Sequence, residues 1–320
     1  MTSEDKTIAY PVRFLDIDAD DAGQRLDNFL LRHLKGVPKS RVYRALKKGE
    51  VRVNKGRVKP DYRLKTGDNV RVPPVKVDEK KKAFVGDSLQ ARLEKAIIFE
   101  NDDLLIVNKP TGLAVHGGSG INIGLIEALR QMRPDCRRLE LAHRLDRDTS
   151  GCTVVVKNAK TLRYLHQQLR ERTMDKTYLC LVKGRWPRRR TLVDIGLDKN
   201  ILKSGERMVK ATTEGKPSKT RFAVVNALPG ATLIEAKPIT GRTHQIRVHA
   251  QYAGFPLLGD DKYCSKEDNE WARTKGLDRL FLHAAEISFK LTPEGQPVVF
   301  KAPLPQALEK VVNRFISEDK

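Results

Sequence analysis

An aspartate between two arginines, Asp146, combines the charge and the setting that a nucleophilic side chain needs. It lies in the segment HRLDRDTSG, residues 143–151, with Arg144 and Arg147 close on either side. Positively charged neighbours favour the ionised form of a carboxyl group, and the ionised form is the one that can attack a substrate. We therefore predict that Asp146 is a nucleophilic carboxylate.

The residues after Asp146 indicate how its side chain is held. Residues 148–151, DTSG, are typical of a turn in which short side-chain oxygens bind nearby backbone amides and a glycine takes unusual dihedral angles. The apolar run CTVVV at 152–156 predicts a buried strand, which gives the preceding loop a rigid base. The alternative is a structural turn whose carboxylates only cap amides and pair with arginines.

Two later segments combine a regular element with polar side chains. The alternating segment DKTYLCLV at 175–182 predicts a strand, in which Tyr178 taken alone is a packing residue. The segment TGRTHQIRVH at 240–249 predicts a basic loop that leads into a helix ending at Gly254. His244 and His249 lie five residues apart without a third ligand at a usual spacing, so we predict no metal site.

From about residue 95 onward, strand patterns dominate the chain. Residues 97–99 and 104–107 flank a turn and predict a hairpin, and residues 221–225 and 231–236 predict another. An amphipathic helix follows the strand at 152–156. Many strands with few helices between them indicate an α+β fold with a mixed or antiparallel sheet, and they argue against a doubly wound fold.

The N-terminal region has a composition of its own. Residues 22–72 contain 15 Lys and Arg against 4 Asp and Glu, and they predict two short helices followed by short strands. We expect an N-terminal extension at 1–20, this basic domain at 21–74, a charged linker at 75–92 and a catalytic domain at 93–320. A small basic α+β domain of any other kind would show a similar pattern.

The composition of the whole chain limits its partners and its location. The net charge of +21 favours a polyanionic partner, because phosphate backbones bind through many Lys and Arg contacts. We expect no signal peptide and no membrane span, and hence a cytoplasmic protein. The four cysteines form no C-x-x-C pair, so we expect neither disulfides nor a metal site.

Four segments taken together resemble the RluA-type pseudouridine synthases, which isomerise uridine in RNA. They are 143–151, 175–182, 240–249 and FLHA at 281–284, and they occur in the order of that family. The basic domain resembles an S4-like (αL) RNA-binding module. The resemblance implies a pseudouridine-synthase core, with a mixed or antiparallel sheet flanked by helices, behind an N-terminal S4-like domain.

The same resemblance implies a role for each site residue. Asp146 is then the nucleophile, Tyr178 lies against the uracil and relays the C5 proton, and Arg247 pairs with the reactive aspartate. Arg144 fills the place that the flipped uridine leaves, and Leu282 lines the floor of the base pocket. The S4-like module would bind RNA through the cations of its second helix, which are Lys39, Arg41, Arg44, Lys47 and Lys48.

The substrate follows from two further segments. Residues 200–207 and 214–218 resemble the branch of the family that modifies 23S ribosomal RNA, which predicts ribosomal RNA of the assembling large subunit as the partner. We expect no cofactor, no metal, no membrane association and a monomer. Attack at C1′ of the sugar, abstraction of its 2′ proton and addition to C6 of the base all remain possible.

Two other functions compete with this prediction. A non-catalytic S4-type ribosome-assembly factor would use the basic domain alone. An S4-bearing RNA methyltransferase would need a glycine-rich strand–loop–helix for its methyl donor, and we find none in the sequence.

Overall fold

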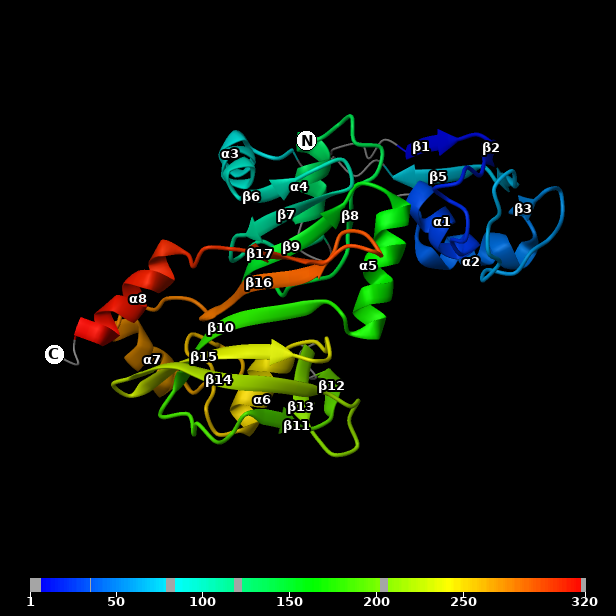
Figure 1. The fold of residues 1–320 in the computed structure, drawn as a ribbon. Helices are drawn as coiled ribbons and strands as arrows, with labels where there is room; N and C mark the ends of the chain where they lie inside the picture. Colours follow the sequence, from blue (N-terminus) through cyan, green and yellow to red (C-terminus); the bar gives the residue numbers. More distant parts are fainter. Residues whose placement is uncertain (1–6, 35, 79–83, 118–122, 202–206, 318–320) are drawn as a thin grey trace, which may run out of the picture. The chain divides into compact units, whose positions relative to one another are not determined.

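The chain forms two compact units, residues 1–84 and residues 85–320, in a computed structural model. The structure describes residues 7–34, 36–78, 84–117, 123–201 and 207–317 (Figure 1). Part of the predicted linker, residues 79–83, and part of the segment at 200–207 lie outside these described residues.

The N-terminal unit contains the two predicted helices and two small antiparallel sheets. Its helices are α1 (Leu26–His33) and α2 (Lys39–Lys48). Its strands are β1 (Thr7–Tyr10), β2 (Arg13–Asp16), β3 (Arg52–Val53), β4 (Asn69–Val72) and β5 (Val75–Asp78). Strands β2, β4 and β3 form one sheet in that order, and β1 pairs with β5 in the other. The apolar faces of both helices pack against buried valines of β4, which gives this unit a hydrophobic core of its own.

The predicted extension and linker were wrong in part. Residues 13–16 pair with β4, and residues 7–10 pair with 75–78, so these segments belong to sheets. Residues 87–95 form helix α3 (Asp87–Lys95), in which Leu93 is fully buried. Four-residue strands are too short to show a clear alternation, and charged side chains are common on edge strands. Hydrophobic periodicity alone therefore does not identify these short strands.

The second unit is built on one mixed ten-stranded sheet. Its main path runs β11-β14-β15-β10-β16-β9-β7-β6, with β17 beside β16 and β8 beside β9 (Figure 1). Its strands are β6 (Ile97–Glu100), β7 (Leu104–Lys109), β8 (Glu140–Leu141), β9 (Ser150–Val156), β10 (Asp175–Lys183), β11 (Leu192–Asp194), β14 (Lys219–Leu228), β15 (Ala231–Pro238), β16 (Leu282–Lys290) and β17 (Pro297–Lys301). Strands β9 and β16 are parallel and the other pairs are antiparallel, so the predicted mixed sheet is confirmed. Both predicted hairpins, β6–β7 and β14–β15, are present.

A separate hairpin and five further helices complete this unit. The hairpin joins β12 (Leu197–Ile201) to β13 (Arg207–Ala211). The helices are α4 (Leu125–Met132), α5 (Ala159–Glu171), α6 (Gln245–Tyr252), α7 (Lys266–Thr274) and α8 (Gln306–Ser317). None of the helices in the described ranges could span a lipid bilayer.

Strand β9 is buried along its whole length because helices cover both faces of the sheet there. Successive side chains of a strand point to opposite faces. Accordingly Val154 packs in a cluster with Leu165 of α5, whereas Val155 packs in another with Leu93 of α3 and Leu129 of α4. Burial on both faces explains why the sequence shows a continuous apolar run here instead of an alternation.

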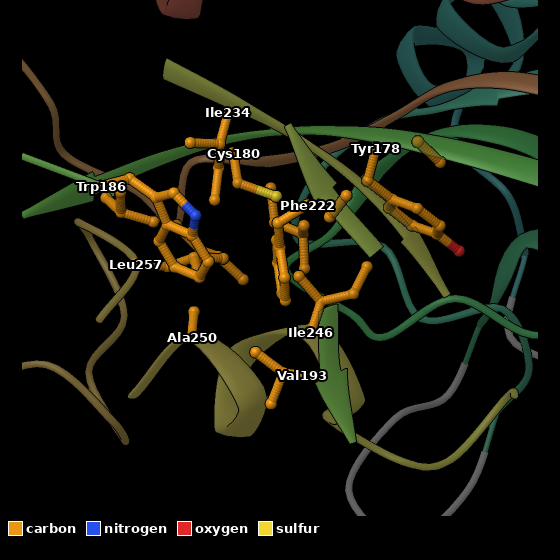
Figure 2. Packing of buried hydrophobic residues seen from close by; sticks show 14 of the residues in the cluster. Tyr178, Cys180, Trp186, Val193, Phe222, Ile234, Ile246, Ala250 and Leu257 are labelled. Carbon is orange, nitrogen blue, oxygen red and sulfur yellow. The ribbon is translucent and has the colours of Figure 1, made fainter. Parts of the chain in front are cut away.

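A further hydrophobic cluster fixes helix α6 against strands β10, β14 and β15. Figure 2 shows Tyr178 at one end of this cluster, with its hydroxyl pointing away from Trp186 at the other end. The rings of Trp186 and Phe222 lie 4.7 Å apart, and Ile246 of α6 packs in the same cluster. Because Arg247 follows Ile246 in the helix, this packing also fixes the backbone position from which the Arg247 side chain extends.

Candidate active site

Sheet register brings together segments that lie far apart in the sequence. Strand β9 starts at Ser150, which pairs with His283 of β16. Strand β10 runs on the other side of β16, where Tyr178 pairs with Ala284 and Cys180 pairs with Leu282. The loop that carries Asp146 and the strand that carries Tyr178 therefore flank the start of β16.

Gly151 allows β9 and β16 to approach each other at this point. Its φ is +112°, and a Cβ atom there would lie 2.2 Å from the backbone oxygen of Ala284. Any side chain would push the two strands apart. Glycine is therefore needed here both for the positive φ and for the close approach of the strands.

Buried Lys109 holds the loop next to Asp146 through its main chain. Its Nζ donates to the backbone oxygens of Pro110 (3.0 Å), Leu113 (2.8 Å) and Arg147 (3.0 Å). Burial lowers the pKa of this lysine to about 7. Lys109 was not among the predicted site residues, because a lysine at the end of a strand carries no sign of being buried.

The far end of the loop is tied to the sheet by Ser150, not to nearby amides as we predicted. Its hydroxyl lies 2.9 Å from His283 Nδ1 and accepts from Arg279 Nη2, also at 2.9 Å. His283 is fully buried, and its Nε2 lies 3.1 Å from the backbone oxygen of Ala302. A histidine in this setting donates from Nε2 to the carbonyl and accepts the serine proton at Nδ1, which makes it neutral.

The neutral histidines of this unit predict how its stability depends on pH. Burial lowers the pKa of His283 to about 4 and that of His143 to about 3. Below about pH 6.5 the unfolded chain binds a proton at each of these side chains and the folded chain does not. The free energy of unfolding should therefore fall as the pH falls from 6.5 to 4, by about 1.4 kcal/mol per pH unit for each histidine.

Urea unfolding between pH 7.5 and 5 measures this slope. Tryptophan fluorescence reports on the second unit, because both tryptophans, Trp186 and Trp271, lie there. His283→Gln should flatten the slope whatever its effect at neutral pH, and His116→Gln at an exposed position should not. An equal slope in wild type and His283→Gln would show that His283 is not held neutral.

The predicted site residues of the second unit line one pocket of about 120 Å³. They are Arg144, Asp146, Tyr178, Arg247 and Leu282. The side chain of Asp146 is 24% exposed, which makes it reachable from solvent, while Tyr178 and Leu282 are buried. Cavities of about 150 Å³ accommodate benzene, so this pocket has the scale of a single flat ring.

Arg247 binds a second aspartate more closely than it binds Asp146. Its Nε and Nη2 donate to the two carboxylate oxygens of Asp260 at 2.7 and 2.6 Å, whereas its Nη1 lies 3.9 Å from Asp146 Oδ2. Burial alone would lower the pKa of Arg247, but the hydrogen bonds and charge of Asp260 outweigh it and raise that pKa. The arginine predicted to pair with Asp146 is therefore shared between two aspartates, and Asp260 forms the bidentate ion pair with it.

Asp260 was not predicted, although a buried arginine requires a carboxylate partner. Its side chain is fully buried and also accepts hydrogen bonds from the backbone N–H groups of Lys262 and Tyr263. The sequence offers Asp260 and Asp261 side by side, and only the fold shows that the first is buried and the second exposed.

His244 is the other residue beside Asp146 that the sequence analysis did not assign to catalysis. Its Nε2 lies 3.8 Å from Asp146 Oδ2, and its Nδ1 lies 2.8 Å from the hydroxyl of Tyr263. Burial lowers the pKa of His244, and the opposing charge of Asp146 does not offset this.

Within the described ranges no group of three His, Cys, Asp or Glu could hold a metal ion.

The arginines next to Asp146 in the sequence do not hold it in the way we predicted. Arg147 donates from Nε to Asp148 Oδ1 at 3.0 Å, on the exposed side of the loop. The exposed Arg144 lines the pocket wall. Residues adjacent in a loop point in different directions, so the groups near a carboxylate come mainly from other elements, here from α6 and its N-cap His244.

A basic groove of about 620 Å³ adjoins the pocket. Its lining contains no acidic residue. Arg144, Lys176 and Arg242 line both the groove and the pocket, and Arg170 and Arg172 from the end of α5 line the groove alone. Such a surface suits a chain of phosphates.

The five cations predicted to bind RNA in the N-terminal unit all lie on α2. Lys39, Arg44, Lys47 and Lys48 are exposed. Arg41 is half-buried, and its Nη1 donates to Glu50 at 2.9 Å.

Comparison with known proteins defines the class to which this fold and site belong. The family model for RNA pseudouridylate synthase matches residues 103–252, and the S4 domain model matches residues 24–70. The solved structure "Human RNA Pseudouridylate Synthase Domain Containing 4" has the same fold, with a TM-score of 0.59 at 24% identity over 72% of this chain and 96% of its own.

Other relatives have a much higher sequence identity to this chain than the protein of this solved structure has. "Ribosomal large subunit pseudouridine synthase C" of Pasteurella multocida is 54% identical over 97% of this chain and 95% of its own length. The protein of the same name from Escherichia coli (strain K12) is 52% identical over 97% of this chain and 98% of its own. The chain belongs to the RNA pseudouridylate synthase family and carries an S4 domain, as predicted.

Proposed function

We propose that the protein converts specific uridines of large-subunit ribosomal RNA to pseudouridine, with Asp146 as the catalytic carboxylate. The observation that carries this proposal is the pocket, in which Asp146, Tyr178 and Arg247 meet around a space the size of one ring. Relatives at 52–54% identity bear the name of a large-subunit enzyme, which supports the choice of substrate.

The pocket accounts for the steps of an isomerisation. A uridine leaves the RNA stack at a cost of a few kcal/mol and enters the pocket. Asp146 then acts at C1′, at the 2′ proton or at C6. The bond from C1′ to N1 breaks, the base turns, and a bond from C1′ to C5 forms. N1 gains a proton and C5 loses one, so no external donor or acceptor of electrons is needed.

The surrounding side chains support these steps. Burial raises the pKa of Tyr178, and the charge of Asp146 adds to this effect, so the phenol keeps its proton at neutral pH. Its ring can lie against the uracil, and Leu282 can form the floor beneath the base. The exposed Arg144 at the pocket wall can fill the position in the RNA that the uridine has left.

RNA binding involves both units in this proposal. The basic groove holds the phosphates next to the flipped uridine, and the exposed cations of α2 contact a separate part of the RNA. Because the exposed side chains of α2 are lysines and arginines, which bind phosphates, we expect this helix to contribute affinity and no chemistry.

Charge reversal tests both surfaces. The double variants Arg170→Glu/Arg172→Glu and Lys47→Glu/Lys48→Glu should each weaken RNA binding and reduce the salt dependence of log Kd by about 1.4, since each lost phosphate contact on a single strand accounts for about 0.7. Lys266→Glu/Lys310→Glu, on exposed faces of α7 and α8, is the control for total charge. An effect of the control equal to that of the groove variant would mean that only net charge matters.

Release of tritium from [5-³H]uridine in a 23S ribosomal RNA transcript tests the function itself. We expect the purified protein to release tritium and to form an equal amount of pseudouridine, because the C5 proton is lost once in each turnover. Binding of the RNA without tritium release would favour the non-catalytic assembly factor.

We further propose that the enzyme works in the cytoplasm as a monomer without a metal. Its activity should then survive EDTA, and its mass in solution should be that of one chain.

A further inference from the structure

Two nitrogen donors face one carboxylate oxygen of Asp146. Each donor belongs to a side chain whose other nitrogens are hydrogen-bonded to a buried residue. Arg247 Nη1 lies 3.9 Å and His244 Nε2 lies 3.8 Å from the same oxygen, Oδ2. Asp260 holds the arginine through its other two nitrogens, and the hydroxyl of Tyr263 holds the histidine through Nδ1. Distances near 4 Å in the free enzyme shorten when a substrate closes a site.

The hydrogen bonds of Tyr263 determine which nitrogen of His244 carries the proton. The backbone N–H of Val209 donates to the Tyr263 oxygen at 3.0 Å, so this oxygen already acts as an acceptor. Tyr263 is buried, and a buried hydroxyl needs an acceptor for its own proton. His244 Nδ1, at 2.8 Å, supplies that acceptor. A neutral imidazole that accepts at Nδ1 carries its proton on Nε2, which is the nitrogen that faces Asp146.

The backbone of His244 also indicates that its position is imposed by the surrounding structure. Its φ is +52°, in the left-handed region, which is uncommon for any residue other than glycine, although asparagine, aspartate and histidine adopt it more often than the rest. This conformation costs on the order of a kilocalorie per mole, and it places the imidazole at the N-terminus of α6 over the pocket. The loop before it is fixed by Gln245, whose Oε1 accepts from Thr240 Oγ1 and from the N–H of Arg242.

We propose that His244 is a positioning residue for the reaction. In its neutral form it donates from Nε2 to Asp146 Oδ2, next to Arg247, and Tyr263 sets the tautomer that makes this possible. The two donors fix the carboxylate by one oxygen and leave Oδ1 as the oxygen that reacts. The proposal rests on the catalytic role of Asp146, and it adds a chain of hydrogen bonds from Val209 through Tyr263 and His244 to the nucleophile.

Nitrogen-15 NMR of the imidazoles tests the tautomer directly. In the wild type we expect the signals of His244, assigned with a His244→Asn variant, to show a protonated Nε2 and an unprotonated Nδ1 between pH 6.5 and 8. Tyr263→Phe keeps the ring that packs on Arg247 and removes only the hydroxyl, so it should yield a mixture of tautomers. A protonated Nδ1 in the wild type, alone or in a fully protonated ring, would overturn the proposal.

Kinetics of matched variants test the consequence. We expect Tyr263→Phe to lower kcat about tenfold, the scale of a modest misalignment of a reacting group, with KM unchanged. His244→Gln places an N–H where Nε2 stands, whereas His244→Asn places one where Nδ1 stands. The glutamine variant should therefore keep more activity, although asparagine fits the left-handed backbone better and should give the more stable protein.

The opposite order of activities would refute the proposal, because fold stability alone favours asparagine. Such a result would leave the proposed function intact as long as the wild type still forms pseudouridine. Failure of the wild type to do so would instead remove the proposed function, so the two failures are distinguishable.

Discussion

Replacement of Asp146 by asparagine is expected to lower pseudouridine formation at least about a thousandfold, which corresponds to about 4 kcal/mol of lost transition-state stabilisation. Asparagine has the same shape but no negative charge, so it can neither attack the sugar or the base nor remove a proton. RNA affinity should stay the same or rise slightly, since a negative charge near the phosphates is lost. Single-turnover assays at saturating enzyme measure the chemical step alone.

The adjacent turn offers a control for this variant. Asp148 lies two residues away, and its carboxylate pairs with Arg147 on the exposed side of the loop. Asp148→Asn should keep a rate within about fivefold of the wild type, because removal of an exposed ion pair costs less than about 1 kcal/mol. If Asp146→Asn retained a tenth of wild-type activity, Asp146 would not be the catalytic carboxylate.

Replacement of Asp260 by asparagine is expected to have the largest effect on stability. It leaves the guanidinium of Arg247 buried without its bidentate partner, and the loss of one member of a buried ion pair costs about 3–5 kcal/mol. The rate should fall as well, because Arg247 is then free to turn away from Asp146. Urea unfolding followed by the fluorescence of Trp186 and Trp271 measures the stability of this unit.

The neighbouring carboxylate provides the matched control. Asp261→Asn changes the net charge by the same amount at an exposed position and should shift the free energy of unfolding by less than about 0.5 kcal/mol. Equal effects of the two variants would show that Arg247 does not depend on Asp260.

Helices and hairpins could be predicted because each is determined by residues that are close together in the sequence. Helical spacing identified α1 and α2, and alternation with turn residues identified the hairpins β6–β7 and β14–β15. The parallel pairing of β9 with β16 joins residues more than a hundred positions apart, and no local pattern specifies it. The pairing of residues 7–10 with 75–78 was missed for the same reason.

The site could be predicted at the level of its reactive side chains and not at the level of their partners. Asp146, Tyr178, Arg247 and Leu282 follow from recognisable segments, and the structure brings all four to one pocket. Lys109, His244, Asp260 and Tyr263 support them through distances that only the folded chain determines. The arginines beside Asp146 in sequence suggested its partners wrongly, because adjacent side chains in a loop diverge.

A map of the pseudouridines in 23S ribosomal RNA from cells that lack this protein tests the central claim most directly. The account predicts that particular uridines remain unmodified in these cells, that the wild-type protein restores their modification, and that Asp146→Asn, produced at the same level, does not. An unchanged map in the deletion strain, or full restoration by Asp146→Asn, would contradict it.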